Sequence, residues 1–245
     1  MRRQVLITGA AGGMGEDTAL RFLDLGDMVI ACDRDEAGLE QLKQNARGRL
    51  GTLLSCRIDL ADAGSFGKAE GLVRQTGRLD VLIHCAGICS ATPLAELSEQ
   101  EWDRTYDINV KGPFFLTQRL LPYLAKTPNS CIVQVSSMAG YTGSVRSNAA
   151  YSSSKAALSC MTKNLAKYCA DMDIRVNEVS PGTADTKMTR DWLGQEGMQQ
   201  FEKLVPLGRL ATAGDISGVV VFLASGDAGF ITGQSIQVNG GMYLP

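Results

Sequence analysis

The segment from Gln4 to Asp33 constrains the fold more than any other part of the sequence. It begins with the apolar run Val5–Ile7, passes through the glycine-rich turn Thr8–Gly15, and then shows helical periodicity before a second apolar run ends at Asp33. Short runs rich in β-branched residues are typical of buried parallel strands. Glycines between a strand and a helix let backbone N–H groups approach a pyrophosphate at the positive end of the helix. The segment therefore predicts a dinucleotide site.

The rest of the chain repeats this alternation. Strand patterns occur at 51–58, 79–87, 130–136, 174–179 and 235–238, and helical patterns occur at 35–47, 62–77, 99–124, 149–171 and 212–224. Residues 187–209 are polar with scattered aromatics and favour neither element, so we expect a substrate-loop insertion there. We predict one α/β domain over 1–245: a doubly wound, Rossmann-type, mostly parallel sheet of about seven strands with helices on both faces.

Composition narrows the classes of partner. The net charge of −2 and the pI of about 5.5 give no electrostatic basis for binding nucleic acid or an anionic membrane. No apolar segment approaches the roughly 18 residues of a membrane span. The seven cysteines are odd in number and mostly lie in apolar runs, which indicates reduced thiols and a cytoplasmic protein. His84 is the only histidine and there is no Cys-x-x-Cys, so we expect no metal site.

Four side chains suggest acid–base chemistry. Tyr151 and Lys155 are four residues apart in a helical pattern, so they share one face. A nearby ammonium lowers the pKa of a tyrosine toward neutrality, which would make Tyr151 an acid or base at cellular pH. Ser137 follows a buried strand, and Asn109 stands inside a helical pattern although asparagine is a poor helix former.

Together with the turn Thr8-Gly9-x-x-x-Gly13-x-Gly15, these residues resemble the classical short-chain dehydrogenases/reductases over essentially the whole chain. The resemblance implies a catalytic tetrad of Asn109, Ser137, Tyr151 and Lys155, with Ser137 and Tyr151 at the substrate. It also implies a homo-oligomer, either a tetramer or a dimer, and a closing turn at Asn239-Gly240-Gly241. The cofactor-binding residues that it implies are Gly9, Gly13, Met14, Gly15, Asp33, Asp59, Leu60, Ala86, Gly87, Tyr151, Lys155, Pro181, Gly182, Ala184 and Thr186.

The sequence departs from the family pattern in two places. His84-Cys85-Ala86-Gly87 stands where the family usually has Asn-Asn-Ala-Gly, so the usual asparagine bonds cannot be assumed from Cys85. One extra residue separates Ser137 from Tyr151, and we place it in the loop 140–148 beside the substrate. Arg146 is the only charged residue of that loop, so we predict that it binds an anionic substrate; the alternative is an arginine that points to solvent.

Two further side chains receive structural interpretations. His84 lies within a strand pattern, and we interpret it as a structural histidine rather than a catalytic base. Cys89 follows the turn after that strand, and we interpret it as a small residue that lines the pocket rather than a redox thiol.

These observations predict an NAD(H)-dependent oxidoreductase that interconverts a secondary alcohol and a ketone, with Tyr151 as acid and base. NAD(H) follows from Asp33, whose carboxylate would accept hydrogen bonds from ribose hydroxyls and repel a 2′-phosphate. Arg34 beside it could instead bind that phosphate. The alternatives are an NADP(H)-dependent carbonyl or 3-oxoacyl reductase and, from another class, a non-catalytic dinucleotide sensor or scaffold.

Overall fold

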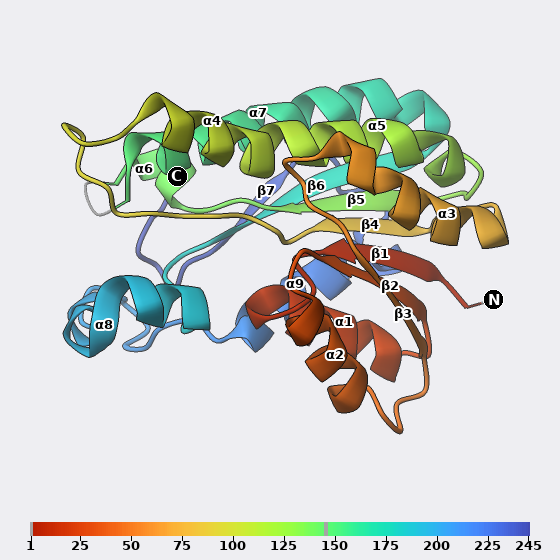
Figure 1. The fold of residues 1–245 in the computed structure, drawn as a ribbon, viewed down its shortest axis with the longest axis horizontal. Helices are drawn as coiled ribbons and strands as arrows, with labels where there is room; N and C mark the ends of the chain where they lie inside the picture. Colours follow the sequence, from red (N-terminus) through yellow and green to blue (C-terminus); the bar gives the residue numbers. More distant parts are fainter. Residues whose placement is uncertain (1, 145–146) are drawn as a thin grey trace.

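In a computed structural model of the protein, which describes residues 2–144 and 147–245, parallel strands form the centre of the molecule (Figure 1). The sheet has seven strands in the order β3-β2-β1-β4-β5-β6-β7. This arrangement confirms the predicted fold class. The strands are β1 (Gln4–Thr8), β2 (Met28–Asp33), β3 (Thr52–Arg57), β4 (Val81–His84), β5 (Ser130–Val135), β6 (Ile174–Pro181) and β7 (Ser235–Val238).

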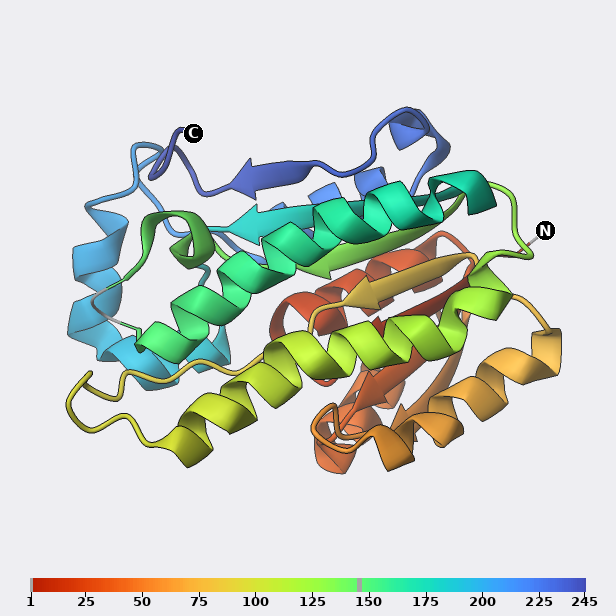
Figure 2. The ribbon, with the colours of Figure 1, turned by 90° about the horizontal axis from the view of Figure 1, so that it is seen from above.

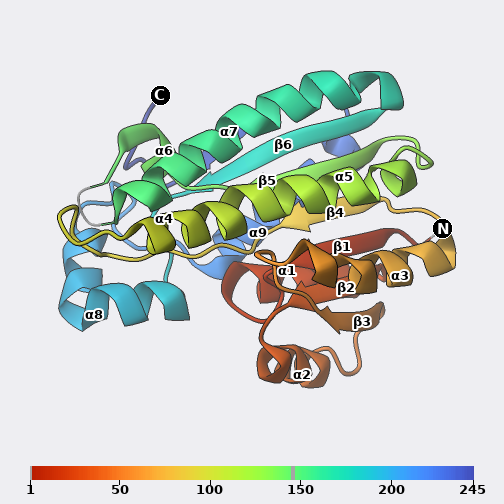
Figure 3. The same cartoon turned by 45° about the horizontal axis from the view of Figure 1, so that its top comes forward.

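Helices cover both faces of the sheet (Figures 1 and 3). One face carries α1 (Gly13–Asp24), α2 (Glu36–Asn45) and α9 (Ala213–Leu223). The other carries α3 (Phe66–Thr76), α4 (Glu99–Tyr106), α5 (Gly112–Leu124) and α7 (Ala149–Cys169). Two more helices, α6 (Ala139–Thr142) and α8 (Lys187–Glu202), lie beyond the carboxyl ends of the strands. Short helical turns occupy η1 (Ala63–Ser65), η3 (Ala170–Met172) and η4 (Gly226–Ala228).

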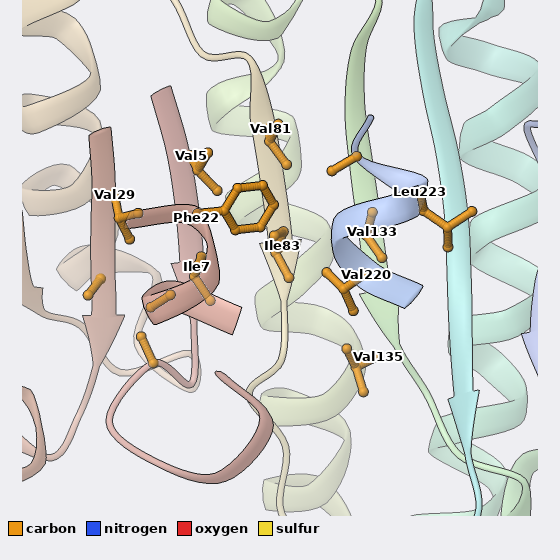
Figure 4. Close-up of a cluster of buried hydrophobic side chains, with 14 of the residues drawn as sticks. Val5, Ile7, Phe22, Val29, Val81, Ile83, Val133, Val135, Val220 and Leu223 are labelled. Atoms are coloured by element: carbon orange, nitrogen blue, oxygen red, sulfur yellow. The ribbon is translucent and has the colours of Figure 1, made fainter. Parts of the chain in front are cut away.

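Side-chain alternation along each strand divides the apolar core into two clusters. Val5 and Ile7 of β1 pack toward α1 and α9, whereas Leu6 between them packs toward α3 and α5. Successive residues of a strand point to opposite faces, so a strand buried on both faces is apolar at every position. Figure 4 shows the first cluster, in which the ring of Phe22 lies over β1 and β4.

A π-helical turn, η2 (Asp107–Lys111), joins α4 to α5 in one continuous helical path (Figure 2). The turn contains Asn109, which is buried. The sequence predicted helix through this region, which is correct, but it did not predict the wider turn. Turns of this kind insert one residue into a helix and occur frequently at functional sites.

Residues 187–209, for which the sequence favoured neither helix nor strand, contain α8 (Lys187–Glu202), and the substrate-loop insertion expected there stays a prediction. The Thr186 side chain caps this helix by accepting a hydrogen bond from the Thr189 N–H at 3.3 Å. A kink at Gly194, whose φ is +64°, interrupts the helical periodicity and explains why the sequence pattern was indistinct. The helix α6 likewise begins the segment 140–148 that we expected to be a loop. Among the helices of the described residues, none has both the length and the apolar character required to cross a membrane.

The core packing predicts a large difference between two phenylalanines. Phe22→Ala removes a fully buried ring and should lower the free energy of unfolding by about 3–5 kcal/mol. Phe230→Ala removes a fully exposed ring and should change it by less than about 0.5 kcal/mol. Urea unfolding followed by circular dichroism would measure both. Equal losses in the two variants would contradict the assignment of Phe22 to the core.

Candidate active site

The glycine-rich turn after β1 brings backbone segments closer together than a side chain would permit. Gly9 has a φ of +72°, and a Cβ atom there would lie 2.6 Å from the backbone nitrogen of Ala86. A Cβ atom on Gly15 would lie 2.0 Å from the carbonyl oxygen of Gly9. Only glycine fits these two positions. The turn therefore passes close to the end of β4, and α1 begins against the turn.

The N-terminus of α1 lies in the wall of a cavity of about 360 Å³. No side chain caps this helix at Gly12, and a Cβ atom on Gly12 would meet no atom within 4 Å. Uncapped N–H groups at a helix start bind phosphate groups well. The residues present therefore fit the pyrophosphate of a dinucleotide. The predicted cofactor residues that line this cavity are Gly9, Gly13, Met14, Gly15, Asp33, Asp59, Leu60, Ala86, Gly87 and Thr186.

Asp33 is held at one end of this cavity by two backbone hydrogen bonds. Its Oδ2 accepts the N–H of Ala11 and its Oδ1 accepts the N–H of Asp35, both at 3.0 Å. Arg34 lines the same cavity, and the sequence had already marked it as a competing group. Lys187 also lines it, and the sequence gave no signal for this residue.

Other predicted cofactor residues lie outside the cavity lining. Pro181 is the last residue of β6 and Gly182 follows it, and a Cβ atom on Gly182 would lie 2.9 Å from the Cα of Asn239. The turn Asn239-Gly240-Gly241 thus packs directly against the segment that follows β6. Ala184 pairs with Ala211 in an isolated β-bridge. These residues support the edge of the site next to Thr186 rather than its wall.

The start of α7 places Tyr151 and Lys155 at the same edge of the sheet. Asn148 caps this helix by accepting the N–H of Tyr151 at 2.8 Å. The Lys155 ammonium lies 5.8 Å from the centre of the Tyr151 ring and donates a 3.0 Å hydrogen bond to the carbonyl oxygen of Val135 in β5. A Cβ atom on Gly87 would lie 3.2 Å from Lys155 Nζ, so the lysine also reaches the end of β4 and the cavity.

The other two members of the predicted tetrad lie in the same cluster. Ser137 forms a hydrogen bond with the Tyr151 side chain and accepts the N–H of Ala139 at 3.1 Å. Asn109 uses its amide within the protein: its Oδ1 accepts the Ile88 N–H at 2.9 Å, and its Nδ2 donates to the Ile88 carbonyl and to Ser154 Oγ, each at 3.0 Å. The π turn therefore connects the segment after β4 to α7.

The ionisation of the tyrosine differs from our expectation. We predicted that Lys155 would lower the pKa of Tyr151 toward neutrality. Burial instead raises the pKa of Tyr151 well above its ordinary value; ionisation of Cys89 at high pH would raise it further, and the hydrogen bond with Ser137 opposes the shift. Burial also lowers the pKa of Lys155 to about 8. Tyr151 is therefore protonated at neutral pH.

A buried carboxylate that the sequence pattern did not predict lies beneath α7. Glu178 of β6 is fully buried, and its Oε1 accepts hydrogen bonds from Ser159 at 2.9 Å, Ser235 at 3.1 Å and Tyr141 at 3.2 Å. The hydroxyl of Ser136 donates to the same oxygen. The negative charge of Glu178 raises the pKa of Lys155 against the effect of burial. The available signal was a charged residue in the middle of a strand pattern.

A second carboxylate, Glu101 of α4, connects the start of α7 to the segment after β4 through hydrogen bonds. It accepts hydrogen bonds from the Asn148 amide at 2.9 Å and from Thr92 at 2.8 Å, and the Ser90 hydroxyl also donates to it. Asn148 additionally donates to Ser90 Oγ at 2.6 Å. Because Asn148 caps α7, these contacts fix the helix end that carries Tyr151.

His84, Cys85 and Cys89, which the sequence also singled out, are uncharged at neutral pH. His84 is buried, its Nε2 lies 2.9 Å from Thr117 Oγ1, and burial lowers its pKa to about 3, so it is neutral at physiological pH. Burial raises the pKa of Cys85 to about 12 and that of Cys89 to about 11, so both are thiols.

Arg146 lies outside the described residues, and its contact with substrate remains a prediction. Within residues 2–144 and 147–245, no group of three or more histidine, cysteine, aspartate or glutamate side chains could hold a metal ion.

Comparisons with known proteins agree on the kind of protein that this chain resembles. Residues 9–243 match the profile of a family described as enoyl-(acyl carrier protein) reductase. The chain is 37% identical over 240 residues to a 3-oxoacyl-[acyl-carrier-protein] reductase, FabG, of Thermotoga maritima, which covers 98% of this chain and 97% of the relative. It is 37% identical over 246 residues to the (2S)-[(R)-hydroxy(phenyl)methyl]succinyl-CoA dehydrogenase subunit BbsD of Thauera aromatica, covering 99% and 97%.

Solved structures show the same similarity in three dimensions. A crystal structure from Brucella melitensis, described as a short-chain dehydrogenase/reductase and glucose/ribitol dehydrogenase, superposes with a TM-score of 0.93 at 36% identity and covers 100% of both chains. The crystal structure of gox2181 superposes with a TM-score of 0.92 at 30% identity, covering 98% of this chain and 95% of that one.

The charge of Glu178 beneath α7 predicts the behaviour of Lys155. Glu178→Gln removes a negative charge that raises the pKa of Lys155, so this pKa should fall from about 8 by roughly one unit. The ¹³Cε chemical shift of labelled lysine, followed against pH and assigned with Lys155→Arg, would measure it. Glu196→Gln removes an exposed carboxylate on α8 and serves as the control. An unchanged midpoint in Glu178→Gln would show that Glu178 does not act on the lysine.

Proposed function

The chain belongs to the classical short-chain dehydrogenase/reductase family, and we propose that it reduces the 3-oxo group of an acyl thioester. The oxidoreductase class and the use of a nicotinamide dinucleotide follow from family membership. The substrate, the identity of the dinucleotide and the roles of individual residues are the content of the proposal.

The protonated state of Tyr151 carries this proposal. Its side chain is half-buried, hydrogen-bonded to Ser137 and next to Lys155, whose ammonium reaches Gly87 in the cavity wall. An acid in this state can deliver a proton to an oxygen that gains negative charge, as a carbonyl oxygen does during reduction. The protonated phenol that Tyr151 presents near pH 7 is the form that carbonyl reduction requires, whereas alcohol oxidation requires the phenolate.

Each member of the tetrad receives a role in this reaction. The bound dinucleotide supplies the hydride, and the protein supplies geometry and the proton. Ser137 holds the carbonyl oxygen beside the Tyr151 hydroxyl, which protonates it. Lys155 presents its ammonium to the cofactor ribose and to the Tyr151 oxygen as negative charge forms there. Asn109 fixes the Ile88 backbone and α7 relative to one another.

The substrate class follows the relatives rather than our first expectation. The sequence alone favoured an unspecified secondary alcohol and kept a 3-oxoacyl reductase as its alternative. The FabG relative is named for a 3-oxoacyl group on an acyl carrier protein, and the BbsD relative for a hydroxy compound bound to CoA. Both names describe an acyl group in thioester linkage. This agreement makes the alternative the better supported proposal.

For the dinucleotide, we propose NAD(H) on the basis of Asp33. Two backbone N–H groups fix its carboxylate, so it would have to break both bonds to turn away from the ribose. At about 4 Å and an effective dielectric constant near 20, a carboxylate repels a phosphate charge by roughly 4 kcal/mol before relaxation and screening. Even a third of this repulsion corresponds to about a tenfold difference in affinity.

NADP(H) is the second candidate, and two observations favour it. Arg34 lines the same end of the cavity, where a guanidinium could pair with a 2′-phosphate. The similarity to 3-oxoacyl reductases also supports the alternative that paired this substrate with NADP(H). The names of the relatives specify no cofactor. The choice between NAD(H) and NADP(H) therefore depends on whether the carboxylate of Asp33 or the guanidinium of Arg34 acts on the 2′ position in this chain.

The role of Tyr151 predicts the effect of removing its hydroxyl. Tyr151→Phe should lower kcat for the reduction of acetoacetyl-CoA by about 10²–10⁴-fold, because the proton donor is lost while the ring still packs. Oxidation of NADH or NADPH, followed by absorbance, measures the rate. Tyr168→Phe removes the hydroxyl of an exposed tyrosine on the same helix and serves as the matched control. A sensor or scaffold would show no turnover even in the wild type, and full activity in Tyr151→Phe would exclude the proposed acid.

The cofactor proposal predicts different effects of substitution at two neighbouring positions, Asp33 and Arg34. The wild type should favour NADH over NADPH in kcat/KM by about tenfold. Asp33→Ala should shift this ratio toward NADPH, because the repelling carboxylate is gone, whereas Arg34→Ala should leave NADH use nearly unchanged. A wild-type preference for NADPH that disappears in Arg34→Ala would establish the second candidate instead. An unchanged ratio of the two kcat/KM values in Asp33→Ala would show that Asp33 does not determine the cofactor preference.

A further inference from the structure

Two cysteines face one another on neighbouring strands at the end of the cavity that holds Asp33 and Asp59, which we assign to the adenosine of the dinucleotide and call the adenosine end. Cys32 of β2 and Cys56 of β3 are register partners in the parallel sheet, and their sulfur atoms are 3.4 Å apart. Neighbouring strands lie about 4.8 Å apart, which falls within the Cα separation that disulfides span. Closing the sulfur–sulfur bond therefore requires a local shift of two side chains and strand ends, without unfolding of the sheet.

The two thiols differ in a way that suits sequential oxidation. Cys56 is half-buried, whereas Cys32 is fully buried. The hydrogen bond from Cys32 lowers the pKa of Cys56, and the positive charge of Lys68 lowers it further, although burial opposes both. The same hydrogen bond raises the pKa of Cys32. Cys56 is thus the accessible sulfur that forms a thiolate, and Cys32 is the neighbouring thiol that can resolve it.

The pair is connected to the residues that we assign to the cofactor. Cys32 lines the cavity and precedes Asp33 directly in the chain. The Ile58 N–H, two residues after Cys56, donates a 3.0 Å hydrogen bond to the Asp33 carbonyl oxygen. The chain then continues from Ile58 to Asp59, which lines the same cavity. Movement of the two sulfur atoms toward one another would therefore be transmitted to both sides of the adenosine end.

We propose that peroxides oxidise Cys32 and Cys56 to a reversible disulfide that weakens dinucleotide binding, an inference that rests on the proposed function. The Cys56 thiolate attacks a peroxide oxygen, the O–O bond breaks, and Cys56 becomes a sulfenic acid. The Cys32 sulfur then attacks the Cys56 sulfur and displaces its oxygen as water. In total, two thiols and one hydrogen peroxide give one disulfide and two waters, so the sulfur atoms lose two electrons and the peroxide gains them.

The coupling has a geometric cause and a reciprocal consequence. The sulfur atoms must approach from 3.4 Å to about 2.05 Å, which moves the end of β2 that carries Asp33. Binding sites tolerate displacements of only about 0.5 Å at the groups that contact the ligand. If the disulfide weakens dinucleotide binding by some factor, the bound dinucleotide must disfavour the disulfide by the same factor.

The first experiment counts thiols in the full-length protein. Hydrogen peroxide should reduce the number of titratable thiols from seven to five, with a crosslink between the Cys32 and Cys56 peptides, and dithiothreitol should restore all seven. Cys56→Ser and Cys32→Ala should each abolish the crosslink, and Cys160→Ser, which removes an exposed thiol elsewhere, should retain it. Urea unfolding establishes that each variant is folded. A wild-type protein that keeps seven thiols, or forms no such crosslink, overturns the proposal.

The second experiment measures the effect on binding. Fluorescence titration with NADH and with NADPH should give a dissociation constant at least about fivefold higher for the oxidised protein than for the reduced one. Half of the protein is crosslinked at a certain ratio of oxidised to reduced glutathione. This ratio should rise when the better-bound dinucleotide is present. Equal dissociation constants for a fully crosslinked and a reduced protein would overturn the coupling. A reduced protein that binds neither dinucleotide would instead contradict the proposed function, while the thiol count would still report on the disulfide.

Discussion

The site depends on the close approach between the turn after β1 and the end of β4. A side chain on Gly9 would overlap the backbone of Ala86, and a side chain on Gly15 would overlap Gly9 itself. These contacts place the start of α1 between two strands that are adjacent in the sheet but far apart in the chain. At this point the connections from β1 and β4 diverge to opposite faces of the sheet, which opens the crevice in which α/β proteins bind ligands. The cavity is therefore a product of the topology, and the glycines allow the backbone to follow it.

The reactive groups are arranged by a second, polar layer beneath α7. Burial alone would disfavour the charge on Lys155, but Glu178 lies below the same helix and supports that charge. Several hydroxyl groups from neighbouring elements satisfy one oxygen of this carboxylate. Glu101 performs a comparable task at the helix start by holding Asn148, the cap of α7. Two carboxylates that never face the cavity thus determine where Tyr151 lies and which charge its neighbour carries.

The strand pattern and the glycine turn were sufficient to predict the fold class, because both depend on local periodicity and on the conformational freedom of glycine. The spacing of Tyr151 and Lys155 likewise predicted their shared helix face. Their ionisation could not be predicted, since it depends on burial and on Glu178, which is distant in the chain. The helix α8 escaped detection because its kink at Gly194 breaks the periodicity. The pairing of Cys32 with Cys56 required the register between two strands, which no single stretch of sequence contains.

The π turn in the path from α4 to α5 has a consequence for how this chain can vary. Each residue of an α-helix advances the chain by about 100° around the helix axis. One inserted residue therefore rotates the helix segment before it relative to the segment after it. Glu101 lies before the turn, whereas the apolar side chains of α5 that fill the core lie after it. A deletion of one residue within Asp107–Lys111 would keep a regular helix and its composition, yet it would rotate Glu101 away from Asn148. Lineages that preserve the Asn148 cap of α7 must therefore preserve the length of this segment, even where its residues change.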